Sequence, residues 1–184
     1  MFYAFFSAIV CASRRKHGKT LVFKKNVVFD EWKWYNYPNS RIEVNMNVTI
    51  IDGQGGQLGA QLVKEITTRF PFVDLTAVGT NAIATSTMLK AGAKNIATGE
   101  NSVLVACRKA DVIVGPIGIV IADSLLGEIT EKMAVAVGRA DAVRILLPVN
   151  KCNNYVAGIS SSNVKTLIDD AILKLGNVIA NINS

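Results

Sequence analysis

The residues best suited to chemistry in this sequence form a glycine-rich turn, Gly53-Gln-Gly-Gly-Gln-Leu-Gly59. Glycines let a backbone turn tightly and approach a phosphate group, and the start of a helix offers free N–H groups and a positive dipole end. We therefore predict that the backbone amides of this turn are free to meet an anion. The residues predicted to contact a nucleotide there are Asp52, Gly53, Gln54, Gly55, Gly56 and Gly59.

The spacing of these glycines bears on the class of ligand. Gly53, Gly55 and Gly59 follow G-x-G-x-x-x-G, whereas the dinucleotide fingerprint is G-x-G-x-x-G. No Lys follows the glycines, so the pattern disfavours a Walker-type loop and triphosphate hydrolysis. NAD(P) or another nucleotide is the expected cofactor class, and its identity is left open. The alternative is a tight strand-to-helix turn without a ligand.

Two later segments supply polar side chains. Thr80 and Asn81 stand where a dinucleotide site usually carries Asp or Glu, and we expect them to bind a ribose or to cap the next helix. Glu100 and Asn101 are expected to bind sugar or substrate, with Glu100 also a candidate base. The alternative for Glu100 is a favourable interaction with a helix dipole. Asp52 is expected either to accept from the turn's own N–H groups or to face the ligand.

Other reactive groups are few. Cys152, beside Lys151, is the candidate nucleophile, with a structural role as its alternative. The single histidine, His17, precedes Met46, so the rest of the chain has no Ser-His-Asp or Cys-His pair and no His-rich metal site. We predict no metal site. Asp123 and Glu128 flank residues 124–127 and are candidates for metal binding or acid–base work, but we expect them to lie on the solvated surface.

Alternating strand and helix patterns must position these residues. The predicted strands are Asn47–Ile51, Val73–Val78, Asn95–Ala97, Asp111–Val114 and Ala142–Leu147, with an edge strand at Tyr155–Ile159. The predicted helices are Leu58–Phe70, Ala82–Ala91, Glu131–Val137 and one capped by Ser162 or Asn163, while residues 102–109 and 119–126 are ambiguous. Because the strands are continuous apolar runs, we predict one Rossmann-like α/β domain over residues 46–184, with a mostly parallel sheet and helices on both faces.

Parallel strands end at one edge of a sheet, where ligands bind. Five loops rich in Gly, Asn, Thr or Pro follow the predicted strands, and we expect them to converge on one crevice. These loops are Asp52–Gly59, Gly79–Asn81, Thr98–Asn101, Gly115–Gly118 and Pro148–Asn154.

The first 45 residues differ from the rest in composition. They carry eight Lys or Arg and three Asp or Glu, against twelve and eleven in the remaining chain, so the net charge of +6 gives no basic face to the domain. A nucleic-acid partner is therefore not expected. We interpret residues 1–45 as upstream sequence, with translation starting at Met46. The alternatives are an N-terminal arm that packs on the domain, or a membrane-surface segment at Met1–Lys16.

The motifs also carry a resemblance. Ile51-Asp-Gly-Gln-Gly-Gly56, Gly79–Ser86, Ala97–Asn101, Gly115–Gly118, Gly127–Thr130 and Pro148–Cys152 together resemble a small bacterial family, a domain of unknown function with an IDGQGG motif. The resemblance covers residues 46 to about 178. It implies no established activity and no catalytic residue.

Two functions follow from this reading. The first is a cytoplasmic, homo-oligomeric protein that binds a nucleotide or dinucleotide, with redox or group transfer on a small molecule if it is an enzyme. The second is a non-enzymatic metabolite sensor or assembly subunit, favoured by the lack of a convincing acid–base pair. No membrane partner is expected for the domain, and the paucity of cysteines fits a reducing compartment.

Overall fold

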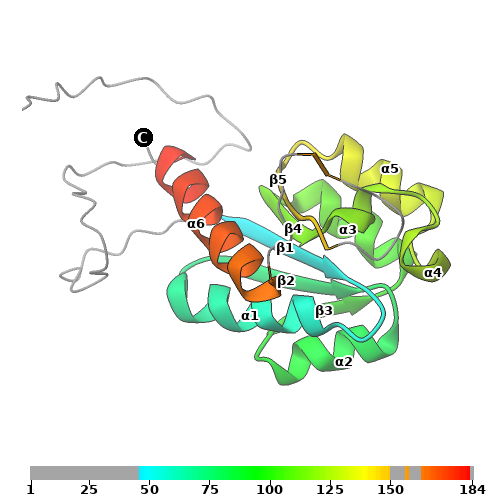
Figure 1. The fold of residues 1–184 in the computed structure, drawn as a ribbon, viewed down its shortest axis with the longest axis horizontal. Helices are drawn as coiled ribbons and strands as arrows, with labels where there is room; N and C mark the ends of the chain where they lie inside the picture. Colours follow the sequence, from blue (N-terminus) through cyan, green and yellow to red (C-terminus); the bar gives the residue numbers. More distant parts are fainter. Residues whose placement is uncertain (1–45, 150–155, 158–162, 183–184) are drawn as a thin grey trace, which may run out of the picture.

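The computed structural model describes residues 46–149, 156–157 and 163–182 of the chain. The first helices and strands alternate regularly, as the apolar patterns predict (Figure 1). The strands are β1 Asn47–Asp52, β2 Asp74–Gly79, β3 Asn95–Thr98, β4 Val112–Pro116 and β5 Val143–Leu147. The helices are α1 Gln57–Arg69, α2 Ala82–Lys90, α3 Glu100–Lys109, the 3-10 turn η1 Ile117–Val120, α5 Glu131–Arg139 and α6 Val164–Ile182. The short segment α4 Ser124–Gly127 is not a regular helix, because Leu125 and Leu126 have left-handed backbone.

The five strands form one parallel sheet in the order β3-β2-β1-β4-β5. The chain first builds outward from β1 through β2 to β3, and then crosses to β4 on the other side of β1. Strand order therefore reverses between β1 and β4, which is the place where open α/β sheets bind ligands. The predicted α/β fold with a parallel sheet is confirmed.

Helices cover both faces of the sheet, as predicted (Figure 1). On one face, the buried stripe of α1 at Leu62 and Ile66 packs with Ile168 and Leu175 of α6. On the other face, α3 and α5 pack together over the central strands. The central strand β1 is buried along nearly its whole length, because side chains on both of its sides meet helices.

The structure resolves both ambiguous segments. Residues 102–109 belong to α3, which begins at Glu100. Residues 119–120 belong to η1 and residues 124–126 to α4, with 121–123 between the two. The predicted edge strand at 155–159 lies mostly outside the described residues, and Val156 and Ala157 are not in a strand. The interpretation of residues 1–45 also lies outside them. Among the described residues, every helix is too short or too polar to cross a bilayer.

Candidate functional site

The turn between β1 and α1 is held from inside by Asp52. Its Oδ1 accepts from the backbone nitrogen of Gly53 at 2.9 Å, and its Oδ2 accepts from that of Gly59 at 2.6 Å. Burial raises the pKa of the Asp52 carboxyl above its usual range, although these two amides oppose the shift. The expectation that Asp52 bonds to the turn's own N–H groups is confirmed.

Three of the four glycines are closely packed against other parts of the protein. A Cβ on Gly56 would lie 2.6 Å from the Cα of Ala84, and one on Gly59 would lie 2.6 Å from the sulfur of Met88. A Cβ on Gly53 would lie 2.7 Å from a carboxylate oxygen of Glu128. Only around Gly55 is there open space, where the nearest atom is 4.0 Å away. The pattern therefore serves contacts with α2 and with Glu128, and Gly55 alone leaves room for a ligand.

Glu128 is the residue that sequence reasoning placed wrongly. It is half-buried rather than solvated, and its Oε2 accepts from the backbone nitrogen of Gln54 at 2.8 Å. The same oxygen accepts from Thr80 Oγ1 at 2.5 Å and from Asn81 Nδ2 at 2.8 Å. Burial alone would raise the pKa of Glu128, but these three hydrogen bonds outweigh it and hold the pKa below its usual range.

The prediction that the amides of the turn are free is wrong for four of them. The N–H groups of Gly53 and Gly59 donate to Asp52, that of Gln54 donates to Glu128, and that of Gly56 donates to the carbonyl of Gly53. The glycine turn thus already binds two carboxylates of the protein itself, those of Asp52 and Glu128. Within the described residues, the N–H groups of Gly55, Gln57 and Leu58 find no acceptor.

Thr80 and Asn81 lie against this turn, as expected for a shared site. Asn81 caps α2 by accepting from the backbone nitrogen of Ala84 at 2.8 Å, which confirms the capping alternative. Its side-chain nitrogen also donates to the carbonyl of Gln54 at 3.0 Å. The amide of Asn81 therefore joins the loop after β2 to the loop after β1.

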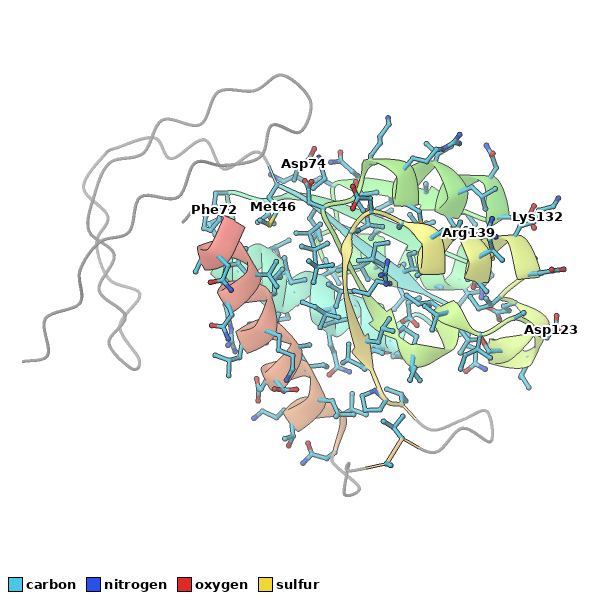
Figure 2. All side chains as sticks on the ribbon, turned by 90° about the horizontal axis from the view of Figure 1, so that it is seen from above. Met46, Phe72, Asp74, Asp123, Lys132 and Arg139 are labelled. Carbon is cyan, nitrogen blue, oxygen red and sulfur yellow. The ribbon has the colours of Figure 1, made fainter. Side chains whose placement is uncertain are left out.

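The segment after β4 folds back over the same edge of the sheet. Leu125 is buried, and its Cδ1 would lie 2.9 Å from a Cβ on Gly53. Ser124 Oγ donates to the carbonyl of Gly118 at 2.5 Å. Figure 2 shows Asp123 and Met46 at opposite ends of the domain. Loops after β1, β2 and β4 thus lie together at the carboxyl edge, which is three of the five loops predicted to share a crevice; the loop after β5 lies mostly outside the described residues.

The side chains of Glu100 and Asn101 form no hydrogen bond with the glycine turn. Glu100 accepts from Thr130 Oγ1 at 2.7 Å and pairs with Lys132 at 3.5 Å. The Thr130 hydrogen bond and, more weakly, Lys132 hold the pKa of Glu100 below its usual range. The exposed Asn101 lines a separate groove of about 370 Å³ beside Thr76 and Ala97. Cys152 lies outside the described residues.

A larger cavity of about 720 Å³ lies at the opposite edge, which sequence reasoning did not anticipate. It opens between the last turns of α3 and α5, beside Asn47, Arg108, Asp111 and Arg139. No residue of the glycine turn lines it. Among the described residues, no group of three or more His, Cys, Asp or Glu is arranged to hold a metal.

Comparison with solved structures gives a distant likeness. The chain is similar to a dodecameric FMN-dependent Ubix-like decarboxylase from Escherichia coli O157:H7, with 18% identity and a TM-score of 0.38. The likeness covers 72% of this chain and 76% of that one. At this level no property of the decarboxylase is carried over. A comparison with curated proteins gave no match.

Comparison with protein families gives a clear result. The family described as a domain of unknown function, DUF3842, matches residues 47–180, which include every described strand and nearly all of α6. The match takes in the glycine turn, the loop after β2 and the loop that carries Glu128. The resemblance to a domain of unknown function is confirmed, and the chain belongs to the DUF3842 family.

Proposed function

We propose that this chain binds an anionic small molecule of the nucleotide class at the carboxyl edge of its sheet, with a phosphate group in the place of the Glu128 carboxylate. One observation carries the proposal. A backbone N–H, a hydroxyl and a side-chain amide, from Gln54, Thr80 and Asn81, all reach one carboxylate oxygen. Each of these groups donates to a phosphate oxygen as readily as to a carboxylate.

The surroundings of this oxygen support a larger anion than a carboxylate. The N–H groups of Gly55, Gln57 and Leu58 belong to the start of α1, where the helix dipole favours negative charge. Gly55 has open space beside its Cα. A phosphate at the three donors would add these amides to its partners, which a single carboxylate does not reach.

The proposed roles of the sequence-predicted residues therefore differ. Gln54, Gly55, Thr80 and Asn81 contact the ligand. Asp52, Gly53, Gly56 and Gly59 shape the turn, because their polar atoms or their missing Cβ atoms serve contacts within the protein. Glu100 and Asn101 lie further along the same edge, where the sugar or the remainder of a nucleotide would extend.

The proposal is tested by isothermal titration of the purified chain with ADP and NAD⁺, and with adenosine as the uncharged control. We expect ADP or NAD⁺ to bind and adenosine to bind at least about tenfold more weakly, since charge-assisted hydrogen bonds to phosphate would be lost. Thr80→Val, which keeps the shape and removes one donor, should weaken binding. Equal binding of ADP and adenosine, or no binding of either nucleotide at millimolar concentration, would overturn the proposal.

Glu128→Gln tests the place of the phosphate. Removing the charge of Glu128 should strengthen ADP binding by about tenfold, because a smaller fraction of the free protein then has the side chain of residue 128 bound to the three donors that ADP needs. Glu131→Gln is the matched control, as Glu131 is exposed and lies three residues further along the chain. Weaker ADP binding by Glu128→Gln would instead make Glu128 an acceptor for ligand hydroxyl groups.

A second candidate is a non-enzymatic metabolite sensor. Both oxygens of the buried Asp52 already accept backbone hydrogen bonds, and Glu128 accepts three hydrogen bonds on one oxygen. Among the described residues of this edge, these carboxylates serve structure in the ligand-free protein rather than stand ready as a general base. Native mass spectrometry would report the oligomer and any retained ligand together. A change of oligomer size on adding ADP would favour the sensor.

A further inference from the structure

We propose that the loop Asp123–Glu128, called here the left-handed loop, is a lid that closes the proposed nucleotide site and that ligand binding opens. The proposal rests on the proposed function for the identity of the ligand. It concerns the regulation of that site, and its closed state is the one that the structure shows. In this state the loop places Glu128 on the three donors and Leu125 against the glycine turn.

The backbone of the loop is strained in the closed state. Three residues other than glycine have positive φ angles, namely Asp123 at 61°, Leu125 at 54° and Leu126 at 60°. A left-handed backbone brings the Cβ of such a residue too close to the following carbonyl oxygen, so leucine rarely adopts it. Strain of this kind persists only where surrounding contacts compensate for it, and it recurs in switch segments.

Few contacts hold the loop to the rest of the domain. Its base is closed by its own backbone, because Asp123 N donates to the carbonyl of Ile129 at 2.8 Å and Ile129 N donates to that of Ser124 at 3.3 Å. Beyond the base, the loop is attached by the three hydrogen bonds to Glu128, by the backbone nitrogen of Ser124 on Ile121 and its hydroxyl on Gly118, and by Leu125, which is buried with Ile119 and Ile129. The other residues of the loop, Asp123, Leu126 and Gly127, are exposed, and such a segment opens at a lower free energy than the core.

The backbone strain favours an open loop, and the contacts of Glu128 and Leu125 favour a closed one. The loop is therefore a two-state element. Opening relieves the left-handed residues and releases the donors, while closing restores the Glu128 hydrogen bonds and the burial of Leu125. An anion that needs the same donors binds the open state only, so it shifts the population toward that state. The apparent affinity then depends on the fraction of protein that is open.

Leu126 permits a test that touches neither the donors nor the ligand, since its side chain is 92% exposed. Leu126→Gly removes the left-handed penalty and should favour the closed loop, whereas Leu126→Ala keeps the Cβ and serves as the matched control. Leu126→Val, with a β-branched side chain, should favour the open loop. The first readout is hydrogen exchange of the Gln54 amide in the protein without ligand, because that N–H is released when Glu128 leaves.

For Leu126→Gly we expect exchange of the Gln54 amide about five- to tenfold slower than for Leu126→Ala, and an ADP dissociation constant larger by the same factor. Leu126→Val should move both quantities the other way. Equal exchange in the Gly and Ala variants would overturn the lid. If exchange changes as expected but ADP binds none of the variants, the lid stands and the proposed function fails.

Discussion

Glu128 and Gln54 are 74 residues apart in the chain, yet a carboxylate oxygen of the first lies 2.8 Å from the backbone nitrogen of the second. This contact joins the loop after β4 to the turn before α1, across the point where the strand order reverses. It gives the glycine turn an anion supplied by the protein.

The glycines of the turn should differ sharply in their tolerance of alanine. Gly56→Ala should lower the free energy of unfolding by about 2–4 kcal/mol, since Gly56 has a φ of 68° and its new Cβ would lie 2.6 Å from Ala84. Gly55 directly precedes Gly56 but has open space around it. Gly55→Ala should therefore change the free energy of unfolding by less than about 0.5 kcal/mol. Urea unfolding measures both, and similar losses in the two variants would contradict this account of the turn.

Asp52 should be required for the stability of the turn. Asp52→Ala leaves the backbone nitrogens of Gly53 and Gly59 without their acceptor in a buried setting. At about 1–3 kcal/mol for each unsatisfied group, we expect the free energy of unfolding to fall by about 2–4 kcal/mol. Asp74→Ala is the control, because Asp74 is exposed and should matter little. A loss as small as that of the control would show that water replaces the carboxylate.

The lowered pKa of Glu128 predicts a pH dependence of the left-handed loop. Because this pKa is lower in the folded state than the value of about 4.3 usual for glutamate, the carboxylate stabilises the closed loop above that value. The stabilisation should disappear as the pH falls through the lowered pKa. The chemical shift of the Glu128 carboxyl carbon should therefore have its midpoint below the usual range for glutamate.

Asp52 should titrate in the opposite sense. Its raised pKa means that protonation of Asp52 favours the folded state, and that this contribution is lost as the pH rises through the raised pKa. Titration of the Asp52 carboxyl carbon should thus have its midpoint above the usual range for aspartate. A midpoint at or below that range would mean that the Gly53 and Gly59 amides, rather than burial, control Asp52. Glu128→Gln should remove the Glu128 step and, because the Glu128 charge contributes to the raised pKa, lower the Asp52 midpoint.

Much of the fold was accessible from the sequence because local patterns determine it. The apolar runs of β1 and β4 predict buried parallel strands. Asn81 and Asn163 each cap the helix for which they were named as candidate caps. In each case the deciding interaction lies within a few residues of the chain, so that residue type and spacing are sufficient to predict it.

The arrangement inside the site could not be predicted from the sequence in the same way. The position of Glu128 depends on left-handed backbone at Leu125 and Leu126, which residue preferences count against. The glycine pattern is also the same whether the missing Cβ makes room for a phosphate or for Ala84. Only the three-dimensional arrangement distinguishes a turn that awaits an anion from one that already holds a carboxylate.

The central claim is that a phosphate replaces the Glu128 carboxylate on the Gln54 amide, Thr80 and Asn81, and reaches the neighbouring amides of the glycine turn. Backbone amide resonances recorded during titration with ADP test it most directly. We predict that the resonances of Gln54, Gly55, Gln57 and Leu58 shift together and saturate at one dissociation constant, while the carboxyl resonance of Glu128 moves toward that of a solvated glutamate. Binding of ADP that leaves these four amides and Glu128 unchanged would contradict the claim.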